Sequence, residues 1–509
     1  MKILSATQIK QVDNCSILKQ NITSWELMER AASRFVENLL PLLNTNTSVY
    51  IFCGKGNNGG DGLAIARMLS SKNFSVHLFI IQHTSTASND FLINLEKIKH
   101  CNLASFKEIF SINDLSDISI NDNHVCIDAI LGSGVNKPTS GILQECIHFI
   151  NQKFSSIISV DVPSGLFLDI PNSPNDSIIK ATHTFTFQMP KLSFFFPENN
   201  IYVGSWKIID IELSQECIDE QATHFFTIDS TLIRKIYQKR NHIKSKWDFG
   251  HTLLIAGSYQ MPGAALLCTN SALRSGCGLV TLHSIASVVS KAVQRFPECI
   301  LSVDSAQDYI QSIPKNLNRY TSIAIGCGIG KNKHSHYVLS KLLQSITNQK
   351  LVIDADGLNT IANDVNFFLP QLPSHQTILT PHIKEFDRIF GHHTTHFDRI
   401  QTALRIAQEK KIVIVLKSPY TAVILPSGQV YFNTIANSGL AKGGSGDVLA
   451  GLIAGLCAKS YSIENAALLG VYIHSIAAKK AIENFHPATL LPSDVVQYFS
   501  SVFYEVENE

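Results

Sequence analysis

The sequence predicts two α/β domains, each a mostly parallel β-sheet covered by helices. Two observations predict this class. Short apolar runs with few charges alternate with helical stretches in both halves of the chain, and such runs are typical of parallel strands that are covered on both faces. Several of these runs end in glycine-rich segments that carry Asp, Asn or Lys. Parallel sheets bind ligands at the carboxyl ends of their strands.

The length agrees with more than one domain. At 509 residues the chain is too long for one ordinary core, and length alone allows two large domains or about three smaller ones. Residues 212–245 are more polar than their surroundings and separate two glycine-bearing α/β patterns. We therefore place the junction near residues 215–235, with one domain over 1–215 and another over 225–505.

The composition restricts the class of protein. A content of 45% hydrophobic and 16% charged residues is globular, and a net charge of +1 favours neither nucleic acid nor a membrane surface as a partner. No apolar run approaches the ~18 residues of a membrane span, and the first ten residues lack the apolar core of a signal peptide. The 11 cysteines are odd in number and form no Cys-x-x-Cys pair. These features predict a cytoplasmic protein with reduced thiols rather than disulfides or a zinc site.

Three predicted strands of the N-terminal half end in polar, glycine-bearing segments. After an amphipathic helix over 25–40, a strand at 48–54 leads through Lys55–Gly62 into a helix, which is the order of a nucleotide-binding crossover unit. This turn matches neither the Rossmann nor the P-loop fingerprint. Two further strands end at Asp128–Pro138 and Asp161–Gly165. One Asp in a loop usually caps a turn, but three such ends on one sheet predict a crevice.

The C-terminal half contains a glycine-rich stretch, Asn437–Leu456, whose second part is small and apolar at helical spacing. It predicts a loop that opens a buried helix at Gly443–Gly446. The free N–H groups and the positive dipole end of such a helix bind anions, phosphate above all. Asp447 would then lie in the first turn and face the same oxygens. The alternative is a tight packing turn that Asp447 only caps, because glycine-rich loops alone are weak evidence.

Other predicted strand ends in this half also carry polar groups. Two carboxylates, Asp354 and Asp356, follow a strand at 351–353, and His382 and Glu385 follow the next strand. A strong strand from Ile412 leaves Lys417 and Thr421 at its end. A Lys and a hydroxyl at this position either contact phosphate or belong to a solvated turn.

The three polar segments of the N-terminal half resemble the signature segments of the NAD(P)H-hydrate epimerase domain, over about residues 5–212. The resemblance implies a Rossmann-like domain with Asp161 as its acid/base group. It also implies a potassium ion held by Asn58, Asp128 and Ser164. The residues implied to bind the hydrated nicotinamide nucleotide are Asn57, Asn58, Gly59, Gly60, Asp61, Gly132, Ser133, Gly134, Val135, Asn136, Lys137, Pro138 and Asp161.

The C-terminal half is similar to the ATP/ADP-dependent NAD(P)H-hydrate dehydratases, a ribokinase-like family, over about residues 225–505. The resemblance implies that Asp447 is catalytic and that Mg²⁺ accompanies ADP or ATP. Adenine-nucleotide contacts are implied for Lys417, Ser418, Pro419, Tyr420, Thr421 and Gly446, and hydrate contacts for Ala264, Gly328, His382 and Asp447. Two departures are Ser445, where the family usually has threonine, and Cys327, where it often has proline.

Together the two resemblances imply a bifunctional repair enzyme. The first domain would interconvert the R and S hydrates NADHX and NADPHX, and the second would dehydrate the S form with an adenine nucleotide. Bacterial members suggest ADP as the donor, and the family suggests a homo-oligomer. One alternative is a ribokinase-like small-molecule kinase with an appended domain. The other is a scaffold whose N-terminal domain only binds, as some domains of this fold do in RNA metabolism.

Overall fold

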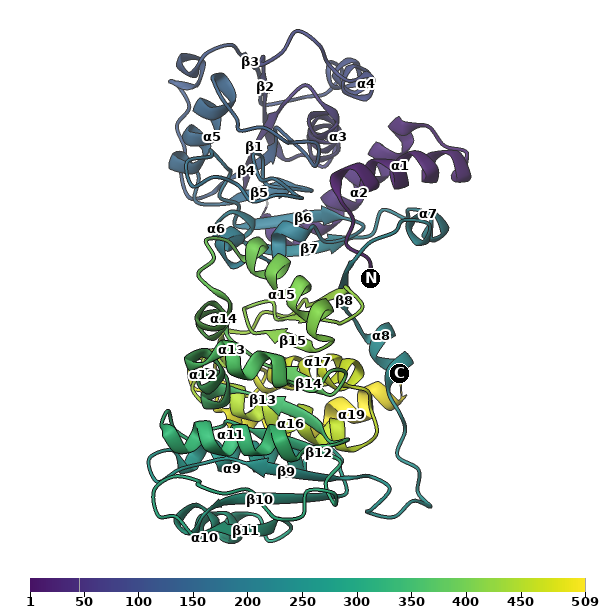
Figure 1. Cartoon of the computed structure of the whole chain (residues 1–509). Coiled ribbons are helices and arrows are strands. Elements are labelled where there is room, and N and C mark those ends of the chain that lie inside the picture. Colours follow the sequence, from purple (N-terminus) through teal and green to yellow (C-terminus); the bar gives the residue numbers. More distant parts are fainter. Residues whose placement is uncertain (45, 509) are drawn as a thin grey trace. The chain divides into compact units, whose positions relative to one another are not determined.

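The computed structural model describes residues 1–44 and 46–508 and divides the chain into two units (Figure 1). The N-terminal unit is Lys2–Thr223, and the C-terminal unit is Met1 together with His224–Glu509. Each unit has a largely parallel sheet with helices on its faces. The predicted α/β class is therefore confirmed.

The sheet of the N-terminal unit has the order β3-β2-β1-β4-β5-β6-β7, and every neighbouring pair is parallel. The order reverses between β1 and β4, which places a crevice at the carboxyl ends of these strands. The strands are β1 (Ser48–Cys53), β2 (Ser75–Ile81), β3 (Ser105–Ile109), β4 (His124–Ala129), β5 (Ile157–Val160), β6 (His183–Phe187) and β7 (Ser205–Ile209).

Helices cover both faces of this sheet because successive side chains of a strand point to opposite sides. In β1, Val49 and Ile51 pack into a core with α1 to α4, whereas Tyr50 and Phe52 pack into a second core with α5. The helices are α1 (Ala6–Gln20), α2 (Ser24–Leu39), α3 (Asn57–Ser71), α4 (Asn89–Ile98), α5 (Ile142–Lys153), α6 (Asn200–Val203) and α7 (Gln215–Asp219), with 3-10 turns at Leu40–Leu42, Ile112–Leu115, Leu192–Phe195 and Pro197–Asn199.

One cysteine pair contradicts the prediction that all thiols are reduced. Cys15 of α1 and Cys217 of α7 form a disulfide, with their Cα atoms 6.0 Å apart. Their separation of 202 residues is the reason that no local spacing revealed the pair. The other nine cysteines are free, and most of them are buried.

The sheet of the C-terminal unit has the order β11-β10-β9-β12-β13-β14-β15-β16-β17-β8. All neighbouring pairs from β11 to β15 are parallel. The order in which the chain adds strands reverses between β9 and β12. The strands are β8 (Phe225–Ile228), β9 (His251–Ile255), β10 (Leu279–Ile285), β11 (Ile300–Asp304), β12 (Ser322–Ile325), β13 (Lys350–Ile353), β14 (Thr377–Leu379), β15 (Val413–Leu416), β16 (Ala422–Ile424) and β17 (Val430–Asn433).

The helices α9, α16 and α17 pack together on one face of this sheet, and α11, α12, α14 and α15 cover the other. The helices are α8 (Ser230–Ile236), α9 (Pro262–Leu273), α10 (Ala286–Arg295), α11 (Lys333–Ser345), α12 (Ala355–Asn363), α13 (Val365–Phe368), α14 (Ile383–Phe390), α15 (His396–Lys410), α16 (Ser445–Ala458), α17 (Ile463–Ala481), α18 (Pro492–Gln497) and α19 (Phe499–Asn508), with 3-10 turns at Leu369–Gln371 and Ser438–Leu440. Within the described ranges, no helix is both long and apolar enough to cross a bilayer.

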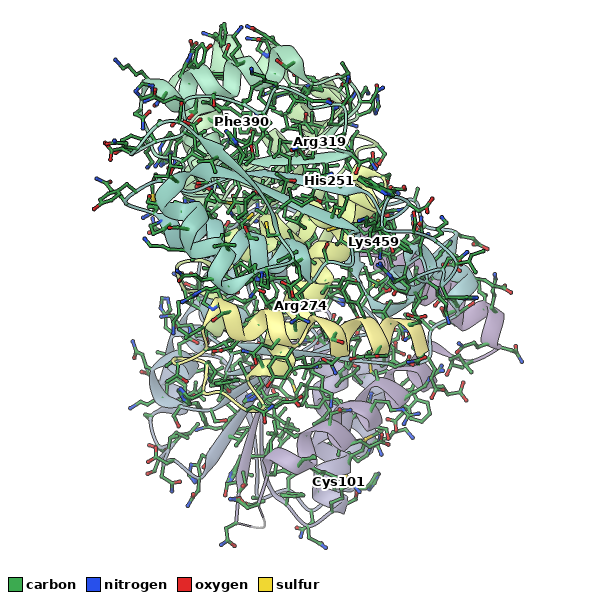
Figure 2. All side chains as sticks on the ribbon, turned by 90° about the horizontal axis from the view of Figure 1, so that it is seen from below. Cys101, His251, Arg274, Arg319, Phe390 and Lys459 are labelled. Carbon is green, nitrogen blue, oxygen red and sulfur yellow. A yellow bond between two sulfur atoms is a disulfide. The ribbon has the colours of Figure 1, made fainter. Side chains whose placement is uncertain are left out.

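Figure 2 shows the side chains that fill this unit. His251 of β9 and Arg319 are labelled close to one another, and both contact the ring of Tyr320. Burial, together with the charge of Arg319, lowers the pKa of His251 to about 4. This histidine is therefore a neutral core residue, hydrogen-bonded to Thr281 at 2.7 Å.

The polar stretch around residues 215–235 is more ordered than the sequence suggests. It contains β8, which pairs in parallel with β17, and α8. Of β15, β16 and β17, whose successive pairs are antiparallel, only β15 is predicted from the sequence. The strands β16 and β17 have three and four residues, too few for an alternating pattern to stand out.

Candidate active sites

The polar strand ends of the N-terminal unit line one cavity of about 660 Å³. They follow β1, β4 and β5, which are adjacent in the sheet. The predicted residues that line it are Asn57, Asn58, Asp61, Gly132, Ser133, Gly134, Val135, Asn136, Lys137, Pro138 and Asp161. The cavity lining does not include Gly59, Gly60, Asp128 or Ser164, which are all buried.

The buried glycines Gly59 and Gly60 let α3 start directly beside the sheet. A Cβ at Gly59 would lie 1.8 Å from the carbonyl oxygen of Gly54, so no other residue fits without moving the backbone. The helix begins at Asn57 without a side-chain cap, which leaves its first N–H groups available at the cavity.

The predicted metal ligands converge beneath the cavity. Asp128 is completely buried and accepts hydrogen bonds from Ser164 N at 2.9 Å and from Ser159 Oγ at 2.8 Å. The hydroxyl of Ser164 also donates to Asp128, and Asn58 Nδ2 donates to the carbonyl oxygen of Leu131 at 3.0 Å. Burial raises the pKa of Asp128, and the hydrogen bonds act against this. All hydrogen-bond donors that the described residues give Asp128 are neutral.

Asp161 is held in a special conformation at the end of β5. Its φ is +63°, a left-handed value that costs energy for a residue other than glycine and is often found at functional sites. Its Oδ1 lies 2.9 Å from Lys191 Nζ and accepts hydrogen bonds from Phe187 N at 2.9 Å and Thr186 Oγ1 at 3.1 Å. Lys191 is buried and also lines the cavity.

Two more carboxylates face Asp161. Asp13 of α1 and Asp61 of α3 line the same cavity. The pKa of Asp13 is raised to about 6, mainly by burial and then by the charge of Asp161, while Lys191 acts in the opposite direction. The pKa of Asp61 is also raised well above its ordinary value. Burial is the largest cause, and the charges of Asp161, Asp13 and Asp90 raise it as well. The site therefore holds three acidic groups beside one buried ammonium.

In the C-terminal unit, α16 begins where the glycine-rich stretch predicts. Gly444 precedes it with a φ of +100°, a conformation that favours glycine. Asp447 lies in the first turn. Ser445 Oγ is buried and has no hydrogen-bond partner among the described residues. This end of α16 therefore offers free N–H groups and a free hydroxyl.

A cavity of about 740 Å³ opens at this helix end. Of the predicted nucleotide-binding residues, all but Tyr420 line it: Lys417, Ser418, Pro419, Thr421 and Gly446. His382 lines it as well, as the N-cap of α14. Its side chain is 50% exposed, and burial of the remainder together with the charge of Lys417 lowers its pKa.

Asp447 belongs to a tight acidic cluster. Ligand atoms of Asp447, Asp354 and Cys327 all lie within 4.8 Å of one another, and Asp354 Oδ1 is 2.7 Å from Lys417 Nζ. The pKa of Asp447 is raised to about 6, mainly by burial and then by the charge of Asp354, while a hydrogen bond with Cys327 and the charge of Lys417 act in the opposite direction. Burial alone would lower the pKa of Lys417, but Asp354 and Glu385 outweigh it and raise this pKa.

The remaining predicted hydrate-binding residues lie together, outside the cavity of about 740 Å³. A Cβ at Gly328 would come within 2.9 Å of the Cβ of Ala264. Gly328 directly follows Cys327, whose thiol adjoins Asp447. The predicted residues thus form two groups: the nucleotide-binding residues with His382 in the cavity, and Ala264 with Gly328 outside it.

Comparison with known proteins matches both halves to family models. Residues 24–193 match the model described as YjeF-related protein N-terminus, and residues 252–500 match the one described as NAD(P)H-hydrate dehydratase. A bifunctional NAD(P)H-hydrate repair enzyme of Moorella thermoacetica is 30% identical over 100% of this chain and 98% of its own. The chain belongs to the bifunctional NAD(P)H-hydrate repair enzymes. The resemblance seen in the sequence is thereby confirmed for the whole chain.

Solved structures resemble the dehydratase half of this repair enzyme. A ribokinase-like superfamily protein of Enterococcus faecalis is 24% identical, with a TM-score of 0.50 over 56% of this chain and 98% of its own, which shows the fold. An ADP/ATP-dependent NAD(P)H-hydrate dehydratase of Bacillus subtilis, co-crystallised with ATP and Mg²⁺, is 26% identical over 56% of this chain and 100% of its own, with a TM-score of 0.46.

Three residues that line the cavities of this repair enzyme were not predicted from the sequence. Asp13 lies on a helix that precedes the first recognised strand, and Lys191 follows a strand that the pattern did not reveal. His474 lines the nucleotide cavity from α17, its Nε2 buried without a partner among the described residues. Burial, together with Lys417, lowers the pKa of His474 to about 4. For His474, the one signal in the sequence was a polar residue within an apolar helix.

Proposed function

We propose that the two units divide the repair of hydrated nicotinamide nucleotides. The N-terminal domain, residues 1–215, interconverts the R and S forms of NADHX and NADPHX. The C-terminal domain, residues 225–505, dehydrates the S form with an adenine nucleotide, ADP rather than ATP. The observation that carries this proposal is the pair of separate cavities at the carboxyl ends of parallel strands: the first is lined by both Asp161 and Lys191, and the second by Lys417, whose partner Asp354 lies behind the lining.

In the epimerase domain, Asp161 is the proposed acid/base group. The substrate carries a hydroxyl on the carbon beside the ring nitrogen. When this hydroxyl leaves as water, the nitrogen lone pair forms a planar iminium, and water returns to either face. A carboxylate that exchanges protons with the departing and returning oxygens supports both steps. The segments Asn57–Asp61 and Gly132–Pro138 would hold the nucleotide.

A potassium ion fits the pocket beneath this site. The side chains of Asn58, Asp128 and Ser164 each offer an oxygen atom as a ligand, and oxygen is the ligand type that a hard cation requires. Asp128 is a fully buried carboxylate with neutral donors only, so a bound cation would compensate its charge. When bound, the ion would fix the loop after β4 through its ligands and supply positive charge below the nucleotide.

In the dehydratase domain, hydroxide is a poor leaving group, and transfer of a phosphoryl group to the hydroxyl of the hydrate removes this difficulty. Asp447 would take the hydroxyl proton as the oxygen forms its bond to phosphorus. The N–H groups at Gly443–Gly446, together with Lys417, would stabilise the phosphoryl oxygens. Loss of phosphate then restores the ring double bond as a ring proton leaves.

Magnesium on the nucleotide phosphates fits the donor set beside Asp447. Asp354 and Asp447 present two carboxylates within 4.8 Å of each other, and Mg²⁺ takes one or two carboxylates together with phosphate oxygens. The thiol of Cys327 does not suit this hard ion. Mg²⁺ would supply charge neutralisation at the phosphates.

The test is incubation of mixed R and S hydrates with the protein and either ADP or ATP, following the absorbance of the reduced nicotinamide. Recovery of both epimers with one nucleotide supports the proposal and identifies the donor. A phosphorylated product that accumulates without NAD(P)H would instead support a small-molecule kinase. If only the S hydrate is converted to NAD(P)H and the R hydrate remains, the result would support an N-terminal domain that only binds.

Two further expectations complete this proposal. The nine free cysteines support a reducing, cytoplasmic location, whereas the Cys15–Cys217 disulfide opposes it, and the redox state of this pair in intact cells tests the location. The family suggests a homo-oligomer, which light scattering of the purified protein would detect.

A further inference from the structure

One face of α1 forms a wall of the N-terminal cavity. Ala6, Ile9, Lys10 and Asp13 line the cavity, and their spacing places them on one side of a helix. A capping box between Ser5 and Gln8 fixes the start of α1, and the disulfide from Cys15 ties it to α7. Asp13 is therefore presented to the cavity by a helix that is anchored at both ends.

The groups around Asp13 differ in how they are paired. Asp161 has three donors on Oδ1, one of which is the buried ammonium of Lys191. Lys191 also donates to the carbonyl oxygens of Phe187 and Met189, at 3.1 and 3.2 Å. The other basic side chains that line the cavity are the exposed Lys10 and Lys137 and the partly buried His83. One buried ammonium thus serves three carboxylates.

This imbalance gives the three carboxylates different surroundings. Lys191, Thr186 and Phe187 all donate to Oδ1 of Asp161. Burial raises the pKa of Asp61 well above its ordinary value, and the charges of Asp161, Asp13 and Asp90 raise it as well. The pKa of Asp13 is raised to about 6 by burial and by Asp161, which lets this group both release and regain a proton near neutrality. Two carboxylates whose environments differ in this way are the usual arrangement of an acid with a base.

We propose that Asp13 is a second catalytic residue of the epimerase domain, the acid that works opposite Asp161. This inference rests on the proposed epimerase function and deepens it. It assigns the acid/base work to two carboxylates from separate elements, α1 and the end of β5. Such a pair serves inversion because one group can act on the oxygen that leaves and the other on the oxygen that returns.

The proton and electron balance closes over one conversion. The Asp13 carboxylic acid gives its proton to the substrate hydroxyl, the C–O bond breaks with its electron pair on oxygen, and water departs. The ring nitrogen lone pair becomes the second bond of the iminium. Water then attacks the other face, its oxygen lone pair forms the new C–O bond, and the iminium electrons return to nitrogen. Asp161 takes the proton that the attacking water loses, and proton exchange with solvent then returns both carboxylates to their starting states. The reverse conversion uses the two carboxylates in exchanged roles.

The test compares Asp13→Asn with wild type in the full chain, starting from purified R hydrate. Appearance of the S hydrate is expected to slow about 10²- to 10³-fold through kcat, with KM changed less than about twofold. Uptake of ¹⁸O from labelled water at the hydroxyl-bearing carbon should slow in parallel. Dehydration of S hydrate by the same preparation should stay at the wild-type rate. Asn14→Ala, a neighbouring exposed position on α1, is the matched control and should epimerise normally.

Wild-type epimerisation by Asp13→Asn would overturn the role of Asp13 while leaving the epimerase function in place. A wild-type protein that does not equilibrate the epimers would overturn that function, and with it this inference. If Asp13→Asn does not fold, Asp13→Glu and the wild-type pH profile decide the question. Epimerisation should fall as the pH rises past the value at which Asp13 loses its proton, and a flat profile there contradicts the role.

Discussion

The two cavities repeat one arrangement of charges in unrelated surroundings. In the N-terminal unit, Asp161 pairs with Lys191 at 2.9 Å and raises the pKa of Asp13. In the C-terminal unit, Asp354 pairs with Lys417 at 2.7 Å and raises the pKa of Asp447. In both, burial is the larger cause and the resulting pKa is about 6.

The two sites differ in what surrounds the unpaired carboxylate. Asp447 lies on the first turn of α16, beside free N–H groups and a free hydroxyl, whereas Asp13 lies within α1, away from any helix end. In the first site the carboxylate itself stands at a helix end that attracts phosphate, whereas in the second the uncapped start of α3 also opens into the cavity but Asp13 belongs to another helix. The difference teaches that an Asp–Lys pair can tune a neighbouring carboxyl group in both cases, while the helix end decides whether phosphoryl chemistry accompanies the proton transfer.

The substitution Asp447→Asn should separate the two reactions most clearly. Dehydration of S hydrate should fall by about 10³-fold or more, because the group that takes the hydroxyl proton is lost. Epimerisation should stay at the wild-type rate, because its carboxylates lie in the other unit. Both reactions can be measured on one preparation by chromatography of the hydrates. Equal loss of both activities would contradict the division of labour.

Replacing each lysine by methionine tests how much each Asp–Lys pair contributes to the free energy of unfolding. Lys417→Met leaves the buried carboxylate of Asp354 without a hydrogen-bond donor among the described residues, and should lower the free energy of unfolding by about 3 kcal/mol. Lys191→Met leaves Asp161 with Thr186 and Phe187 as donors, so its cost should be about 1 kcal/mol. Denaturant unfolding of each variant measures this order, and a larger loss for Lys191→Met would reverse our account.

The pH dependence should have opposite signs in the two reactions. Dehydration needs ionised Asp447, so its kcat/KM should rise about tenfold per pH unit below about pH 6 and then level off. Epimerisation of the R hydrate needs protonated Asp13, so its kcat/KM should fall as the pH rises above about 6. Rate profiles of one preparation between pH 5 and 8, on purified R and S hydrates, test both limbs. If both rate profiles rise or both fall over this pH range, the roles assigned to Asp13 and Asp447 are wrong.

The smallest expected effect comes from potassium, which should act on one site only. A cation that binds the folded state at ten times its Kd adds about 1.4 kcal/mol of stability. Replacing K⁺ by tetramethylammonium should therefore lower the melting temperature of the N-terminal unit and slow epimerisation several-fold. Dehydration serves as the internal control. Asp128→Asn should make the melting temperature insensitive to K⁺.

The sequence predicted the strand ends because they combine two local signals, a charge-free apolar run and a following glycine-rich turn. Asn57, Asp161 and Lys417 could be found in this way. Asp13 and Lys191 could not, because their importance depends on contacts with segments more than 25 residues away, such as those that place both beside Asp161. His474 differs from its neighbours only as a polar residue within an apolar helix, which by itself does not indicate a site. The antiparallel strands β16 and β17 were not predicted because they are too short to show alternation.

The bond between Cys15 and Cys217 gives the N-terminal unit a closed covalent circuit. All seven strands of its sheet lie within this circuit, while Asp13 lies just outside it, on the short tail that precedes Cys15. A protease that cuts one loop between β1 and β7 would open the circuit without releasing a fragment. The nicked chain would then migrate as one molecule on a gel until a reductant separates its pieces.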